Sequence, residues 1–251
     1  MKINRTAKRT IEILELIATS DKDLTLNDIT LELKIPKTSV FDILETLVYL
    51  NMIYVKGQRL KTYAIGIKAY VIGNNYSKTS LLLNSADSII KELAEETGLP
   101  VLIAKENSGS LIYILKQEPI KKIIATPEVG DTDSLHSTAS GKAILAYAKN
   151  PLELLEHLKL SKSTSFTITS KTELMADLFQ IRSREYAVSD RESAEHIFSI
   201  AAPIFDYNQV VSSSLEVFCL YQNDSNFENV ITAVVQAAQK ISQLLDFAKI
   251  R

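Results

Sequence analysis

The 251-residue sequence has little cysteine and little histidine: one cysteine, Cys219, and three histidines. A lone cysteine cannot form an intramolecular disulfide, and such sparse use is typical of proteins from the reducing cytosol. No apolar run approaches the roughly 18 residues of a membrane-spanning helix. The first residues, MKINRTAKRTIEI, contain neither the apolar core nor the cleavage site of a signal peptide. We therefore expect a cytoplasmic protein with no membrane partner.

The scarcity of these residues also argues against a metal site and against nucleophilic catalysis. His136, His157 and His196 do not stand at the close spacings of metal ligands. Folding could still bring His136 and His196 together, but ordinary structural histidines are the simpler interpretation. Cys219 lies among apolar residues in SLEVFCLY, which indicates a small buried side chain rather than a nucleophile. No nucleophile-elbow sequence is present. The sequence predicts neither an enzyme nor a cofactor.

A phosphate-binding loop is also missing, although Gly141 and Lys142 offer half of its pattern. The P-loop needs a glycine five positions before Gly141 and a serine or threonine after Lys142. His136 and Ala143 occupy those positions. We therefore interpret Lys142 as a surface or helix-capping lysine.

The chain has no large positive excess either. The formal net charge is −2. Residues 1–66 contain 10 Lys and Arg against 8 Asp and Glu, whereas residues 67–251 contain 18 against 22. The slight basic excess of the first segment is a weak indication of a nucleic-acid partner. At about 100–200 residues per domain, the chain is long enough for two domains.

What the first segment does contain is a clear order of elements. Apolar residues recur at helical spacing over residues 5–19 and 37–50, and a short helix is predicted between them, over residues 25–33. Two strand-like runs follow, at 52–55 and 62–65, around a glycine suited to a hairpin turn. Three short helices followed by a hairpin predict a winged helix-turn-helix.

In such a domain, the second helix of the motif enters the major groove, which is wide enough for a helix and displays a distinct pattern of donors and acceptors. We expect DNA contacts from this helix, from the wing and from the first helix. The candidate DNA-binding residues are Lys37, Thr38, Ser39, Phe41, Asp42, Lys56, Arg59, Lys61, Arg5 and Arg9. The alternative is a protein-interaction or dimerisation module. Asp42 and Glu45 favour it, because carboxylates repel phosphates.

Beyond residue 66, the pattern predicts linker helices and then an α+β domain. Helices are expected at 68–74, where Asn74 and Asn75 end the pattern, and at 79–96. The elements expected after them are strands at 101–105, 111–116 and 122–126, helices at 138–148, 152–160 and 171–184, strands at 186–190, 197–205 and 213–221, and a helix at 227–248.

Three blocks of this sequence resemble the IclR-type transcriptional regulators, and together they extend the resemblance over nearly the whole chain. The first is LTLNDITLELKIPKTSVFDILETLVYLNMI. The more specific two are LHSTASGKAILA at Leu135–Ala146 and IRSREYAVSDRESAEHIFSIAAPIFD at 181–206. The resemblance implies a winged helix at 1–66, linker helices at 67–99 and a GAF-like effector-binding domain at 100–251. It also implies a homodimer or homotetramer on a palindromic double-stranded DNA operator, controlled by a small metabolite.

Carried over by position, the resemblance implies that the effector pocket is lined by residues from the start of the SGKA helix and from the last strands. These residues are Ala139, Ser140, Gly141, Ser189, Asp190, Ser199, Glu216 and Phe218. The helix start has a physical basis for anion binding, because its free N–H groups and positive dipole end attract negative charge. Gly141 would let the backbone approach the ligand closely.

The sequence departs from the family's pattern at four positions. Glu185 and His196 stand where glycines are usual, and Asp42 replaces an arginine common in the recognition helix. Glu216 replaces a residue that is often small and polar. A carboxylate there would repel an anionic effector. Either Glu216 is protonated or paired, or the effector is neutral or cationic. Asp42 suggests an unusual operator.

These observations lead to one main hypothesis and two alternatives. The main hypothesis is a ligand-responsive DNA-binding regulator, with repression as the default direction. The first alternative is a small-molecule-binding or interaction module whose winged helix no longer binds DNA. The second is an enzyme that uses the pocket of the second domain, against which the missing catalytic motifs argue.

Overall fold

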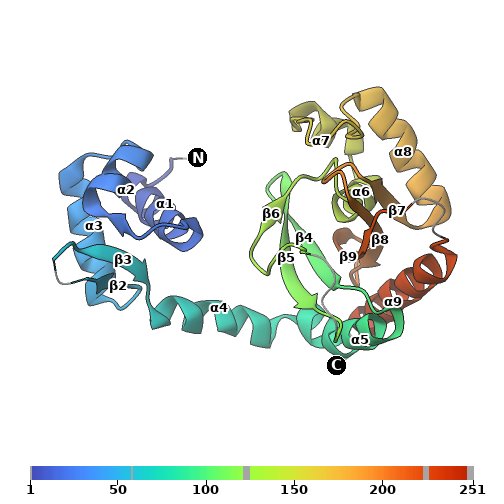
Figure 1. Cartoon of the computed structure of the whole chain (residues 1–251), viewed down its shortest axis with the longest axis horizontal. Helices are drawn as coiled ribbons and strands as arrows, with labels where there is room; N and C mark the ends of the chain where they lie inside the picture. Colours follow the sequence, from blue (N-terminus) through green and yellow to red (C-terminus); the bar gives the residue numbers. More distant parts are fainter. Residues whose placement is uncertain (1, 58, 121–124, 223–225, 248–251) are drawn as a thin grey trace. The chain divides into compact units, whose positions relative to one another are not determined.

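The computed structural model describes residues 2–57, 59–120, 125–222 and 226–247 (Figure 1). The chain divides into two compact units, Met1–Thr79 and Ser80–Arg251. The helix predicted at 79–96 therefore packs within the second unit, although it was assigned to a linker. Within the described ranges, no helix combines the length and apolarity needed to cross a membrane.

The first unit is a winged helix-turn-helix, as predicted. Its elements are α1 (Arg5–Thr19), β1 (Leu24–Thr25), α2 (Leu26–Leu33), α3 (Lys37–Tyr49), β2 (Ile53–Lys56), β3 (Thr62–Ile65) and α4 (Ile67–Thr79). The hairpin of β2 and β3 gains a third strand, because the two residues of β1 pair with β3. Sequence patterns did not predict β1, since two residues carry no periodicity.

Local chemistry explains where these helices begin. Asn4 accepts a hydrogen bond from the backbone N–H of Ala7 and caps α1. Thr25 and Asp28 form a reciprocal capping box at the start of α2. One prediction is wrong: α4 does not end at Asn74 and Asn75 but continues through them to Thr79. The unit is held together by one apolar core, whose fully or almost fully buried members include Ile13, Ile29, Val40, Leu44 and Ile53.

The second unit is an α+β domain built on a six-stranded antiparallel sheet in the order β6-β5-β4-β9-β8-β7. Its strands are β4 (Val101–Asn107), β5 (Ser110–Gln117), β6 (Thr132–Asp133), β7 (Ala187–Asp190), β8 (Ile197–Phe205) and β9 (Val211–Leu220). Its helices are α5 (Leu81–Thr97), α6 (Ala139–Ala146), α7 (Pro151–His157), α8 (Lys171–Arg184) and α9 (Glu228–Phe247).

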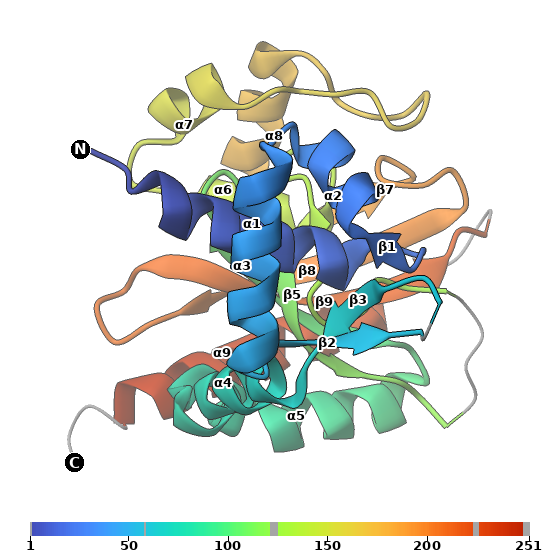
Figure 2. The same cartoon turned by 90° about the vertical axis from the view of Figure 1, so that its left-hand side faces the viewer.

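Helices cover both faces of this sheet (Figures 1 and 2). The face under α5 and α9 is apolar and includes Val101, Ile200, Leu215, Val217 and Cys219. We call it the α5/α9 face. Alternate residues of the same strands point to α6, with α8 packed beside it, and we call that side the α6 face. Because strand side chains alternate, each central strand serves both cores.

Most predicted elements of the second unit are confirmed within a few residues, but the third strand is not. Of the range 122–126, residues 122–124 lie outside the described residues, and 125 and 126 are not in a strand. The strand beside β5 is instead β6. The helix predicted at 152–160 ends at His157. Residue 248, the predicted end of the last helix, also lies outside the described residues.

Candidate functional site

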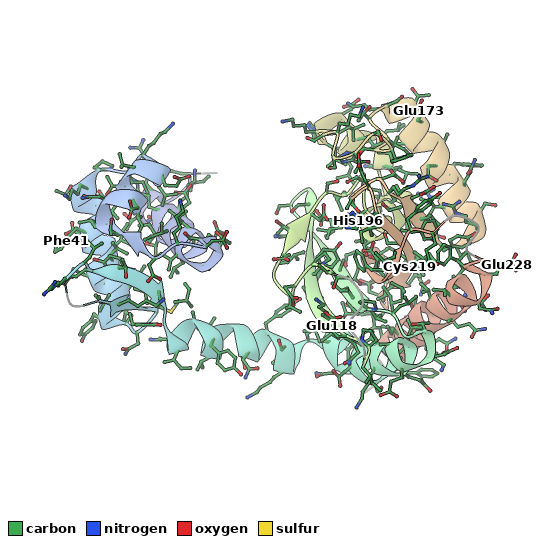
Figure 3. The ribbon with its side chains drawn as sticks, viewed as in Figure 1. Phe41, Glu118, Glu173, His196, Cys219 and Glu228 are labelled. Atoms are coloured by element: carbon green, nitrogen blue, oxygen red, sulfur yellow. The ribbon has the colours of Figure 1, made fainter. Side chains whose placement is uncertain are left out.

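Most of the residues predicted to contact DNA lie on the surface of the first unit. Lys37, Thr38, Phe41 and Asp42 are exposed on the first turns of α3, and Figure 3 shows Phe41 at the edge of the unit. Ser39 is half-buried. The arrangement presents one end of α3 to a groove, as readout of base edges by a recognition helix requires.

Two of the predicted cations are already engaged by neighbouring side chains. Arg9 donates from Nη1 to Ser39 Oγ at 3.5 Å, which joins α1 to α3. Lys56 Nζ lies 2.9 Å from the Asp23 carboxylate, and that hydrogen bond raises the pKa of Lys56. The other four predicted basic residues are exposed: Arg5, Lys37, Arg59 and Lys61.

In the second unit, four residues from four elements converge in a buried cluster on the α6 face. Ser140 comes from α6, Ser199 from β8, Glu216 from β9 and Tyr113 from β5. All four are completely buried. The Tyr113 hydroxyl donates to Glu216 Oε2 at 3.4 Å. We call these residues the Glu216 cluster. The carry-over by position placed three of them in one site, and the fold brings these three together.

The polar atoms of the Glu216 cluster are mostly unsatisfied. Among the described residues, Ser140 Oγ, Ser199 Oγ and Glu216 Oε1 make no hydrogen bond of normal geometry and are shielded from solvent. A buried polar atom without a partner costs about 1–3 kcal/mol. Three such atoms at one place make the Glu216 cluster the candidate binding site of the second unit.

Burial controls the charge of the cluster. It raises the pKa of Glu216 to about 7, while the nearby hydroxyls of Ser140 and Ser199 lower that pKa and the Asp133 carboxylate raises it further. Burial likewise raises the pKa values of Tyr113 and Asp133. Glu216 is therefore close to half-protonated at neutral pH.

Other residues predicted for the pocket have partners within the protein. The Ser189 hydroxyl donates to the carbonyl of Ser137 at 2.8 Å, tying β7 to the segment before α6. Phe218 packs edge-on against the ring of Tyr113, and Ala139 is completely buried in the same core. Asp190 is exposed and pairs with Arg191 at 2.8 Å. The structure does not bring Asp190 into the Glu216 cluster.

Gly141 is explained by packing of the chain. A Cβ atom at this position would lie 2.4 Å from the Cα atom of Leu135, so only glycine fits. Its N–H donates to Thr138 Oγ1, the N-cap of α6, at 3.0 Å. Gly141 was predicted to let the backbone approach a ligand closely. In the structure, it lets the backbone of α6 approach Leu135 in the preceding loop.

The prediction for Lys142 is wrong. It is 1% exposed, and its ammonium lies 2.8 Å from Asp177 on α8 and 2.5 Å from Glu192 after β7. We call this trio the Lys142 network. Burial raises the pKa of Glu192, and Lys142 opposes that rise. The network holds α6, α8 and the β7–β8 turn together.

The histidines lie in two different environments. Both ring nitrogens of His136 have partners, Ser134 Oγ and the carbonyl of Ser161, each at 3.0 Å. Burial lowers the pKa of His136. His196 is exposed, and Figure 3 labels it together with the buried Cys219. Within the described part of the chain, no group of three or more His, Cys, Asp or Glu residues could hold a metal.

A pocket of about 470 Å³ opens beside the segment that precedes α6. Its lining residues are Ser108, Gly109, Ser110, Thr132, Asp133, Ser134, Leu135, His136, Leu154, His157, Leu158 and Lys159. Asp133 links this pocket electrostatically to the cluster, because its carboxylate acts on Glu216 and Tyr113. Tyr113 and Asp133 were not among the pocket residues predicted from the sequence. The alternation of β5 could have placed Tyr113 on the α6 face.

Models of known families match both units. The helix-turn-helix domain of the IclR family matches residues 6–56, and the C-terminal domain of the bacterial IclR transcriptional regulators matches residues 75–243. The chain belongs to the IclR family. Membership confirms the predicted winged helix-turn-helix, the α+β second domain and a regulator rather than an enzyme. This IclR-family protein is a DNA-binding transcriptional regulator with an effector-binding C-terminal domain.

Individual relatives extend the match along the chain. The HTH-type transcriptional regulator BhcR of Paracoccus denitrificans is 30% identical over 243 residues, which are 95% of this chain and 86% of the relative. An IclR-type regulator from Alicyclobacillus acidocaldarius superposes with a TM-score of 0.87 at 22% identity, over 97% of this chain and 100% of that one. An IclR homologue from Microbacterium hydrocarbonoxydans, crystallised with 4-hydroxybenzoate, superposes with a TM-score of 0.83 at 18% identity, over 96% and 98%.

Proposed function

We propose that this IclR-family regulator is a cytoplasmic repressor that binds a palindromic operator as a homodimer or homotetramer and leaves it when a small metabolite binds. In this proposal, residues 1–66 bind DNA, 67–99 link the domains and 100–251 bind the effector. The effector completes the Glu216 cluster. The observation that carries the proposal is the set of three unpartnered, solvent-shielded polar atoms inside a domain of an effector-binding family.

The DNA contact is assigned to the exposed end of α3 and to the wing. Lys37, Thr38, Phe41 and Asp42 supply the groove-facing surface, while Arg59 and Lys61 are free to reach phosphates. Lys56 and Arg9 act first as structural cations, because Asp23 and Ser39 engage them. Asp42 accepts a hydrogen bond from a cytosine N4 amino group, the common base partner of a carboxylate in the major groove.

The proposal is tested by measuring binding of the purified protein to its own upstream DNA at two salt concentrations, beside a shuffled duplex. Each phosphate contact contributes about 0.9 to the slope of log affinity against log salt. Lys61→Ala should therefore lower affinity for every duplex and reduce the slope by about one. Lys240→Ala is the matched control, since Lys240 is an exposed lysine on α9 of the other unit.

Effector action is tested on the same complex by adding metabolites and following release of the operator. Equal, salt-insensitive binding to both duplexes would contradict the DNA-binding assignment. It would favour an interaction module, in line with the exposed carboxylates of Asp42 and Glu45 on α3. Operator binding that no metabolite changes would contradict the proposed release.

A further inference from the structure

The charges around the Glu216 cluster are negative. The charge that acts most strongly on Glu216 is the carboxylate of Asp133 on β6, and Tyr113 also experiences Asp131 and Asp133. Lys142 on α6, two residues after Ser140 of the cluster, is a buried cation, but its ammonium already forms ion pairs with Asp177 and Glu192. His136 is held by Ser134 and Ser161, and burial disfavours its charged form. An incoming carboxylate would find no uncommitted cation among these groups.

The hydrogen-bonding capacity of the cluster points the same way. An ionised carboxylate accepts at about four lone-pair positions and donates none. Tyr113 satisfies one position on Oε2, and Oε1 of Glu216 has no hydrogen bond of normal geometry within the described residues, although the Ser140 and Ser199 hydroxyls lie close enough to lower the pKa of Glu216. The hydroxyls of Ser140 and Ser199 can each donate or accept. The cluster therefore complements a ligand that brings hydrogen-bond donors.

The negative surroundings and the unfilled acceptor together identify the chemistry of the ligand. We propose that the effector is a polyol or an amine whose O–H or N–H groups donate to Glu216, and that no carboxylate of the effector faces this residue. The inference rests on the proposed function, because it assumes that the effector occupies the Glu216 cluster. It narrows the small metabolite that the family resemblance implies to one chemical class.

The test is a thermal-shift screen of the full chain against metabolites sorted into acids, neutral polyols and amines. Matched molecules of equal skeleton anchor the comparison: glucose, glucosamine and glucuronate, and glycerol, serinol and glycerate. We expect binding from neutral or amine members and none from the corresponding acids. A screen in which only acids bind, or in which no polyol or amine binds, overturns the inference.

Variants then show whether Glu216 itself is the acceptor. Glu216→Gln preserves shape but turns half of the carboxylate into a donor, so affinity for the polyol or amine hit should fall at least 10-fold. Glu195→Gln, at an exposed glutamate, is the matched control. Unchanged affinity in Glu216→Gln, with the wild-type melting profile retained, contradicts the assignment whatever the ligand.

The pH dependence separates the two ligand classes. An amine should bind more tightly as pH rises through about 7 and Glu216 ionises, whereas a neutral polyol should change little. Asp133 and Tyr113 face the same cluster, so Asp133→Asn and Tyr113→Phe are run in parallel.

Measuring operator release keeps the two proposals distinct. An acid that binds and releases DNA contradicts only this inference. A polyol or amine that binds Glu216 without affecting DNA defeats only the proposed repressor.

Discussion

The two faces of the six-stranded sheet are built from the same strands and yet differ in chemistry. On β9, Leu215 points into the apolar core beneath α5 and α9, whereas its neighbour Glu216 points towards α6. The α5/α9 face is packed with aliphatic side chains. The α6 face mixes apolar residues with buried serines, a lysine and two glutamates. Under the proposed function, one face of the sheet contributes stability and the other binds the effector.

The difference suggests where a binding site lies, because burying polar atoms without partners is energetically unfavourable. Burial of apolar side chains is favourable by about 25 cal/mol per Å², so the α5/α9 face needs no further explanation. Each unsatisfied polar atom on the α6 face lowers stability. A chain selected for stability alone would fill this face with apolar residues as well. Substitutions on each face can test whether the α5/α9 face contributes only stability while the α6 face binds the effector.

Removing the cation of the Lys142 network should break the α6 face most severely. Lys142→Met leaves Glu192 buried without its partner and should cost about 3–5 kcal/mol, measured by urea denaturation. The surface pair Lys240–Glu92 is the control, and Lys240→Met should change stability by less than about 1 kcal/mol. Equal losses of unfolding free energy in the two variants would show that the buried network contributes no more to stability than a surface ion pair.

The α5/α9 face should respond to a cavity and not to ligand chemistry. Leu215→Ala removes a fully buried side chain and should destabilise by about 3 kcal/mol. The dissociation constant of an effector should stay within twofold of the wild-type value, because Leu215 faces away from the Glu216 cluster. Calorimetric titration checks the second part, and a large loss of affinity would remove the proposed separation of the faces.

Glu216 should make stability depend on pH. Its pKa of about 7 in the folded chain lies above the ordinary 4.5, so the folded state binds the proton more tightly. The contribution is fully present below about pH 4.5 and is lost as pH rises through about 7. The loss is on the order of 3 kcal/mol. Glu216→Gln should flatten this part of the profile and be the more stable protein at pH 8. Parallel profiles would contradict the assignment.

The smallest effect is expected at the end of α8, outside both faces. Glu185 holds a left-handed conformation, with φ of 66°, where the C-cap of a helix favours glycine. Glu185→Gly should raise the stability by about 1 kcal/mol, measured as a shift in the denaturation midpoint. Gly98, already left-handed at the end of α5, provides the reverse control, since Gly98→Ala should destabilise.

The sequence allowed the architecture to be predicted because periodicity is a local property. The core stripe of α3, for example, was recognisable from a short window. Lys142 was misjudged because its partners Asp177 and Glu192 lie 35 and 50 residues away. The break expected at Asn74 and Asn75 failed for the opposite reason: propensity is weak, and a continuing helix overrides it.

The candidate site was accessible only in part. The family resemblance assigned Ser140, Ser199 and Glu216 to one pocket, and in the structure these three residues lie next to one another. It also included Asp190, which the strand alternation turns outward, and Gly141, whose role is close packing against Leu135. Tyr113 was missed because it lies 103 residues from Glu216 in the chain. The strand order of the sheet, together with the alternation of β5, shows that both belong to one face.

Helix α4 carries a consequence for how the protein exchanges its amide hydrogens. None of its 13 residues, all within the described part of the chain, is buried, and Tyr70, Val71 and Ile72 are largely exposed. A helix of this length without tertiary support is marginal in water. Its amides should therefore exchange with deuterium orders of magnitude faster than those of α9, whose Val234 and Ile241 are completely buried. Protection that appears in α4 at higher protein concentration would report a second chain covering it.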